Sequence, residues 1–359
     1  MAQKNRRQRR LEQSKQDRAQ QTQRSQRGLG GRGGGDQRRE RRRRRAAWAG
    51  VAVFVVVIAG VTLPLVLTSS GPSGHPTVPG AVLSSRTLLK LPAASAVAEG
   101  TGTGWVTDDL RDLLLRFDPA TGRIERSVHL AGRPVAMVLA GGRLWVADAI
   151  DNEVVEVDPA TLAVEGSIAV PAGPTGLAVL GADVWVSSLQ ASAVTPIDVH
   201  TGVAGTPDSM PAGSVRVAAG YGSLWVTGTT DQLTRVTPGA GAAGVRQRTV
   251  TVGPGPIGVA AGGGAVWVAD ASGGTVSVVS PASMAVTHTL RVGGDPLTVA
   301  VAGDHVYVGD GTAQTVRVVS PAPGSAALIV GTGPRALLPV SGRVWVAGSN
   351  PGRVVEVKP

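Results

Sequence analysis

The chain of 359 residues contains no cysteine and carries a formal net charge of +10 at pH 7. The absence of cysteine excludes disulfides, a lipid-modified cysteine and thiol catalysis, so any folded domain must be stabilised by packing alone. The positive charge does not indicate a basic folded domain, because residues 1–45 hold 17 Lys and Arg against 4 Asp and Glu, whereas the rest of the chain holds 18 against 21.

The first 68 residues divide into a basic tail and an apolar run. Residues 1–45 contain almost nothing to bury, so we expect a disordered basic tail. Residues 46–68 carry no charge, and a helix of this length is about 34 Å long, enough for a hydrocarbon core of about 30 Å. We therefore expect a single transmembrane helix. A cleaved signal peptide is the alternative, but its charged start and apolar run would both be shorter.

The charges beside this run predict its orientation. Arg41 to Arg45 lie directly before it and no such cluster follows, so the N-terminus is expected in the cytoplasm and the later residues outside the membrane. Anionic lipid headgroups are the expected partner of the tail. Nucleic acid is disfavoured because residues 1–47 hold no aromatic side chain for base stacking. Residues 69–80, with three prolines, are expected to form an extended linker.

The remaining residues, 81–359, contain a repeat with a period near 40. An aromatic residue followed by Val recurs at Trp105, Trp145, Trp185, Trp225, Trp267, Tyr307 and Trp345. Short β-rich runs separated by Gly and Pro turns at this period are typical of a β-propeller with four strands per blade. The sequence therefore predicts an all-β, seven-bladed β-propeller.

The second repeat shows the four expected strands, at residues 135–140, 144–148, 153–158 and 165–170. The seventh repeat has only three before Pro359. Residues 89–93 match residues 168–172 in register, so a strand from before the first repeat is expected to complete the last blade. Closing the ring in this way removes open sheet edges.

The aligned repeats resemble a known group of propellers. The phrases Leu144–Asp148 and Val266–Asp270 are each followed by a Val-rich strand and a turn with Pro, and they resemble YVTN and NHL-type repeats and those of the virginiamycin B lyase group. Repeats of this kind occur in binding proteins, sensor domains and a few enzymes. The abundance of Arg, Ala, Gly and Val beside few Lys is typical of a GC-rich bacterial genome.

The virginiamycin lyase resemblance implies a divalent metal and a His general base on one face of the propeller. Repeats of that group read Trp-Phe-Thr-Glu, whereas these read Trp-Val-Ala-Asp or Trp-Val-Thr-Asp. No histidine of this chain matches the catalytic position; the five are His75, His129, His200, His288 and His305. No catalytic residue is therefore carried over.

The position after Trp-Val-x is acidic in four repeats, at Asp108, Asp148, Asp270 and Asp310. Propeller topology places it on the face where the loops lead into the innermost strands and where ligands usually bind. The same face is expected to carry Arg133, Asp295 and Arg335, with Arg216 close by. Four carboxylates could hold a divalent cation or a basic partner. We favour the interpretation that each Asp caps its own turn, with no cofactor.

These patterns together predict a membrane-anchored, extracytoplasmic binding module at the cell envelope with an unknown protein or glycan ligand. A metal-dependent propeller lyase or lactonase is the first alternative, and an envelope sensor is the second.

Overall fold

The structure is a computed structural model that describes residues 83–358 apart from 212, 240–244 and 320–326. The predicted tail (1–45), transmembrane helix (46–68) and linker (69–80), and residues 81 and 82 of the predicted propeller, lie outside the described residues. Within the described part of the chain, no helix has the length and apolar character needed to span a membrane.

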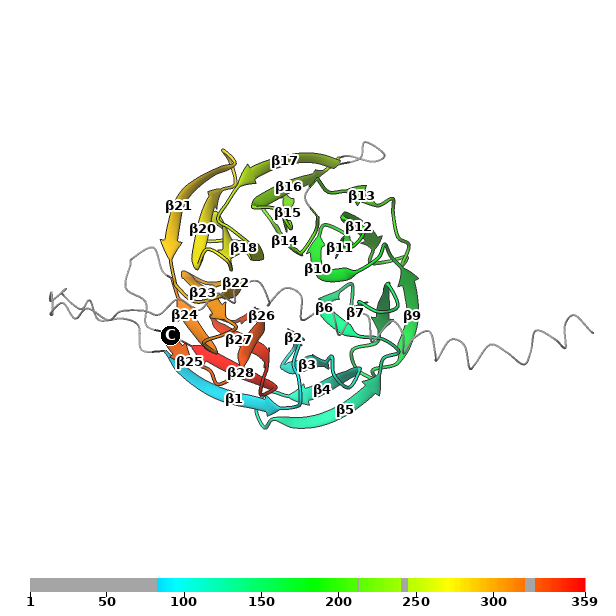
Figure 1. Ribbon diagram of the computed structural model, residues 1–359. Coiled ribbons are helices and arrows are strands. Elements are labelled where there is room, and N and C mark those ends of the chain that lie inside the picture. Colours follow the sequence, from blue (N-terminus) through cyan, green and yellow to red (C-terminus); the bar gives the residue numbers. More distant parts are fainter. Residues whose placement is uncertain (1–82, 212, 240–244, 320–326, 359) are drawn as a thin grey trace, which may run out of the picture. The chain divides into compact units, whose positions relative to one another are not determined.

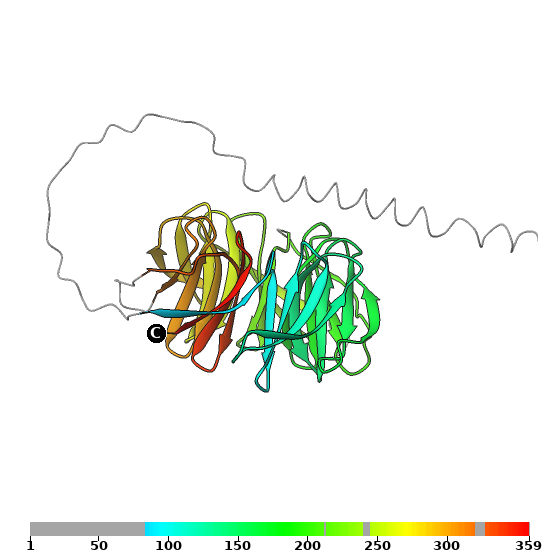
Figure 2. The same ribbon diagram turned by 90° about the horizontal axis from the view of Figure 1, so that it is seen from below.

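The described residues form seven four-stranded antiparallel sheets arranged around a common centre (Figure 1). Each sheet is one blade, and its strands follow one another outward from the centre. Figure 2 shows the blades from the side. The predicted all-β, seven-bladed propeller is confirmed.

The strands fall into four sets by their place in the blade. The innermost strands are β2 (Ala96–Gly100), β6 (Pro134–Ala140), β10 (Pro174–Leu180), β14 (Arg216–Gly220), β18 (Pro256–Gly262), β22 (Pro296–Ala302) and β26 (Gly333–Val340). The second strands are β3 (Thr103–Asp108), β7 (Arg143–Asp148), β11 (Asp183–Ser188), β15 (Ser223–Thr227), β19 (Ala265–Asp270), β23 (His305–Asp310) and β27 (Arg343–Ser349). The third strands are β4 (Leu113–Asp118), β8 (Glu153–Val157), β12 (Ala193–Asp198), β16 (Gln232–Pro238), β20 (Thr275–Ser280), β24 (Thr315–Val318) and β28 (Arg353–Lys358).

The outermost strands are β5 (Arg123–His129), β9 (Val164–Ala169), β13 (Asp208–Ser209), β17 (Val245–Thr251), β21 (Ala285–Arg291), β25 (Ala327–Ile329) and β1 (Ser84–Lys90). The four strands of the second repeat match their predicted ranges to within one residue at each end. The third blade differs from the others because β13 has only two residues.

The last blade is completed by the first strand, as the sequence predicts. β1 pairs antiparallel with β28 over Ser84–Lys90, and the two lie side by side at the edge of the ring in Figure 1. Leu88 and Leu89 are buried in the cluster that joins this blade to the first one. The ring is therefore closed by hydrogen bonds and by apolar contacts together.

The recurring aromatic residue accounts for the packing between blades. Trp145 of β7 lies in one buried cluster with Val184 and Val186 of the next blade, and Trp345 likewise packs with Val97 and Val106 across the closure. Trp145 is fully buried, and its indole N–H donates to the carbonyl oxygen of Ala140 at 3.0 Å. An aromatic side chain followed by Val thus recurs because each blade presents the same surface to its neighbour.

Candidate functional site

The central channel opens at the face where the second strands end and the innermost strands begin, which we call the mouth face. Near this face the seven innermost strands and the residues just before them enclose a cavity of about 220 Å³. Its wall consists mostly of small or apolar residues, and its charged members are Arg216 and Arg335. The channel mouth is therefore a small basic cavity.

Three of the four predicted rim aspartates cap their own turns. Asp108 Oδ1 accepts the backbone N–H groups of Leu110 and Arg111, both at 3.2 Å. The same pattern recurs after β7 and β23, where Asp148 Oδ1 accepts from residues 150 and 151 and Asp310 Oδ1 from residues 312 and 313. These contacts agree with the turn-capping interpretation. Burial raises the pKa of Asp108, and the two N–H groups partly oppose that rise.

The Asp270 carboxylate accepts its hydrogen bonds from side chains instead of turn N–H groups. Its Oδ2 accepts the hydroxyl groups of Thr275 at 3.0 Å and Ser277 at 2.7 Å, and the residue is fully buried. Burial raises its pKa, and the two hydroxyl donors oppose the rise. Asp295 donates its backbone N–H to Asp310 Oδ2 at 3.1 Å, and its pKa is raised by burial and then by the charge of Asp310. Each of these aspartates makes its hydrogen bonds within its own blade, so they do not form one ring of ligands.

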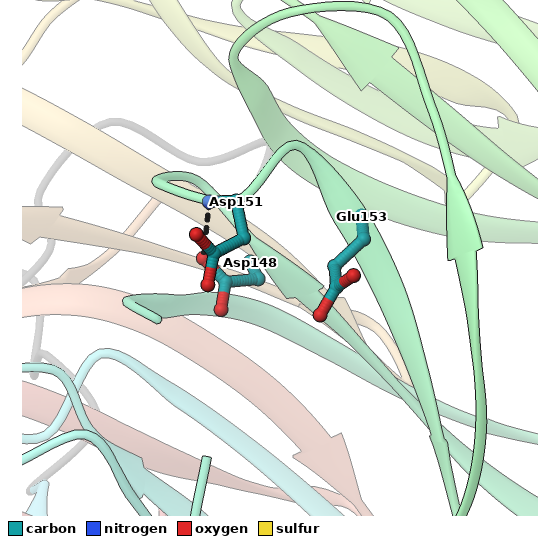
Figure 3. A group of neighbouring side chains, drawn as sticks. All are labelled: Asp148, Asp151 and Glu153. Atoms are coloured by element: carbon teal, nitrogen blue, oxygen red, sulfur yellow. Dashed lines mark hydrogen bonds between the residues drawn. The ribbon is translucent and has the colours of Figure 1, made fainter. Parts of the chain in front are cut away.

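A group of three carboxylates lies beside the mouth face of the second blade. Oxygens of Asp148, Asp151 and Glu153 lie within 4.8 Å of one another, and Figure 3 shows the three side chains facing a common space. Asp148 Oδ1 also accepts the N–H of Arg133 at 3.0 Å, while Oδ2 is buried without a hydrogen-bond partner among the described residues. A Cβ at Gly132 would stand 1.8 Å from Oδ2, so this turn needs glycine beside the carboxylate.

Asp109, which follows β3, joins three blades at the mouth. Its Oδ2 accepts Arg335 Nη1 at 2.9 Å, Arg133 Nη2 at 3.0 Å and Arg133 Nε at 3.2 Å. The Asp109 side chain is 2% exposed, against 21% for Arg133 and 40% for Arg335. Asp109 thus holds one arginine from the second blade and one from the last.

Arg216 lines the cavity from the fourth blade. One Nη atom donates to the carbonyl oxygen of Thr175 in the third blade. Desolvation lowers the pKa of the Arg216 guanidinium, and the positive charge of Arg335 lowers it further. Arg216 forms no ion pair with any carboxylate in the described ranges. The channel therefore contains a partly buried cation to which the described part of the chain supplies no countercharge.

A divalent metal does not fit this channel. Hard cations need carboxylate, carbonyl or water oxygens, and the transition metals of lyase-type sites add imidazole. Among the described residues that line the cavity there is no His, Asp or Glu, and its charged groups are guanidinium cations. The metal and His base implied by the virginiamycin lyase resemblance have no ligand set in this cavity.

The predicted site residues are partly brought together. Arg133 and Arg335 meet through Asp109, Asp295 joins Asp310, and Asp108, Asp148 and Asp270 each remain within their own blade. Asp109 was missed by the comparison of repeats, because the equivalent positions are Ala149, Leu189, Thr229, Ala271, Gly311 and Ser349. The sequence feature that could have identified Asp109 is that its repeat alone has an acidic residue at this position.

No protein-family model matches the chain, and no curated protein matches it in sequence. Solved structures match its fold. A catalytically inactive virginiamycin B lyase from Staphylococcus aureus with quinupristin has a TM-score of 0.68 and 14% identity, over 77% of this chain and all of that chain. The WD40 domain of Neurospora crassa Pan2 gives 0.64 and 10%, over 77% and 95%. BamB from Moraxella catarrhalis gives 0.54 and 15%, over 74% and 83%. At these identities the likeness extends to the propeller fold.

Proposed function

We propose that the chain is a binding module that takes its ligand at the mouth of the propeller channel. The observation that carries this proposal is the basic cavity, in which Arg216 has no countercharge among the described residues and Arg335 shares one carboxylate with Arg133. Buried charged side chains are normally paired with an opposite charge of the protein. A charged side chain that lacks such a partner is typical of a binding site, where the ligand supplies the opposite charge.

We further propose that the module is anchored in the membrane by residues 46–68, with the propeller outside the cytoplasm at the cell envelope and a protein or glycan as its partner. The uncharged run and the arginines before it support this arrangement. The basic tail would then contact anionic headgroups on the cytoplasmic side.

Protease added to intact cells tests the location. It should release a fragment of about 30 kDa by cleavage within residues 69–80, because exposed extended linkers are preferred sites of proteolysis. Protection of the propeller until the membrane is permeabilised would reject the orientation.

Photo-crosslinking from the full-length chain tests the binding face. Leu110, 71% exposed in the turn after Asp108, lies on the mouth face, and Val203, 64% exposed in the loop after β12, lies on the opposite face. A photoreactive residue at position 110 should crosslink an envelope component in intact cells, and one at position 203 should not. Crosslinking from position 203 alone would place the binding surface on the other face.

A further inference from the structure

Arg216 occupies a position where every other blade has a small residue. Each innermost strand pairs one residue with the recurring aromatic, and the position two residues earlier is Ala96, Ala136, Gly176, Arg216, Gly258, Thr298 or Ala336. Six small residues leave open space at this level of the channel, and the seventh adds a guanidinium. The repeat pattern itself therefore gives no packing reason for an arginine at this position.

The charge of Arg216 is costly for the folded protein. Moving a cation out of water disfavours its charged form, and both burial and the nearby Arg335 lower the pKa of this group. The hydrogen bond to the Thr175 carbonyl supplies an acceptor but no negative charge. An anion that binds beside this guanidinium would offset the cost of burying its charge.

Arg335, the second arginine of the cavity, shares its only carboxylate partner among the described residues with Arg133. Arg335 lies at a β-bulge of β26, between residues 334 and 336, and reaches Asp109 Oδ2 at 2.9 Å. That same oxygen also accepts both donors of Arg133. Two guanidinium groups thus share one carboxylate oxygen, and the Arg335 side chain keeps 40% of its surface exposed for further contacts.

We propose that Arg216 and Arg335 form an oxyanion-binding site in the channel mouth, which takes a carboxylate or phosphate group of the ligand. Guanidinium groups bind both of these planar or tetrahedral oxyanions through paired N–H donors. The site rests on the proposed function because it occupies the same channel mouth. A cavity of about 220 Å³ is smaller than the usual pocket for a drug-sized molecule, roughly 300–1,000 Å³, so it accepts a small anion or the anionic end of a larger partner.

Titration of the purified full-length chain with inorganic phosphate and with succinate, at constant ionic strength, tests the site. We expect one or both anions to raise the melting temperature in a concentration-dependent way, because a ligand of the native state alone stabilises it. Binding of phosphate alone, of succinate alone or of both assigns the site to phosphate groups, to carboxylates or to their shared chemistry.

Two substitutions and a matched control locate the binding. R216Q and R335Q should each weaken the affinity by about tenfold or more, the loss expected when one charged hydrogen-bonding partner is removed. R291Q should leave it unchanged, because Arg291 is exposed at the mouth-face end of the outermost strand β21. Without anion, R216Q should melt no lower than the unsubstituted chain, which shows that the fold is intact.

No shift with either anion would overturn the proposal, and so would equal shifts in R216Q, R335Q and R291Q. Should R216Q fold poorly, R335Q decides alone, because its side chain is the more exposed of the two. Crosslinking from position 110 without anion binding would reject the oxyanion site and retain the binding module. Anion binding without such crosslinking would retain the site and reject the proposed module.

Discussion

Arg335 Nη1 lies 2.9 Å from Asp109 Oδ2, although the two residues are 226 positions apart in the sequence. Arg335 belongs to the innermost strand of the last blade and Asp109 follows the second strand of the first, so the ion pair spans the closure of the ring on its mouth face. The closure on the outer side is made by β1 pairing with β28. The two ends of the repeat array are thus joined at both the centre and the rim.

Substitution D109N should destabilise the fold and strengthen anion binding. The carboxylate is buried, and its loss leaves Arg133 and Arg335 without a countercharge. Removing one partner of a fully buried pair costs about 3–5 kcal/mol, and the partial exposure of both arginines reduces this to about 1–3 kcal/mol. Denaturant unfolding measures the loss. The control is D108N, which keeps an oxygen for the turn N–H groups; equal stabilities of the two variants would contradict a structural role for the ion pair.

The closing strand can be tested within the full-length chain. Leu88 and Leu89 are 5% and 6% exposed, so L88A and L89A should each cost about 2–5 kcal/mol of unfolding free energy, as truncations of buried leucines do. S85A, in the exposed part of the same strand, should change little. If the leucine variants unfold at the same denaturant concentration as S85A, β1 contributes nothing to the stability of the ring.

The architecture was predictable because it repeats. The contacts at the mouth were predictable only in part, because they differ from blade to blade. Seven copies of one phrase indicated the blades, and the match between residues 89–93 and 168–172 indicated the closure. Asp109 departs from the residues at its equivalent positions, so a search for recurring residues passes over it. Arg216 was expected close to this face, but the repeats did not indicate that it lines the cavity. The recurring Asp108 was chosen instead of its neighbour, although Asp108 is occupied with its own turn.

The short strand β13 is a second feature that the comparison of repeats does not predict. The third blade has the usual first three strands, but its fourth is reduced to Asp208–Ser209. Residues 203–210 contain Gly205 and Pro207, which disfavour a continuous strand, and Gly205 N–H donates to Pro196 O at 2.8 Å in place of a regular ladder. The Gly and Pro residues of this segment indicate an irregular strand, whereas the 40-residue period alone predicts a regular one.

Divalent cations should raise the melting temperature only slightly. Asp148 already accepts three backbone N–H groups through Oδ1, and Asp270 is occupied by two hydroxyl donors. Melting curves in Ca²⁺, Mg²⁺ and chelator provide the measurement. A large shift that is lost in D148N combined with D151N, and kept in D270N, would identify the three-carboxylate group as a metal site. That result would favour the metal-dependent enzyme over the binding module.

Two aspartates on opposite faces should respond to pH with opposite signs. The folded-state pKa of Asp270 is raised by burial above its ordinary value of 3.8, so its contribution to stability is present below that value and is lost as pH rises through the folded pKa. The pKa of Asp118, at the end of β4, is lowered by the Thr121 hydroxyl and then by the Ala120 N–H. Its contribution is present above 3.8 and is lost as pH falls through the folded pKa.

Melting temperatures of D270N and D118N between about pH 3 and pH 7 test both signs, over the range in which folded and unfolded aspartates titrate. At pH 7, D270N should melt at or above the unsubstituted chain, because it removes a buried charge and keeps an oxygen for the Thr275 and Ser277 hydroxyls. Near pH 3 the two should converge, since the Asp270 carboxyl is then protonated. D118N should melt below the unsubstituted chain at pH 7 and approach it in acid. Should D270N be the less stable variant at pH 7 and recover in acid, the two hydroxyl donors would outweigh burial and the folded-state pKa of Asp270 would be lowered instead of raised.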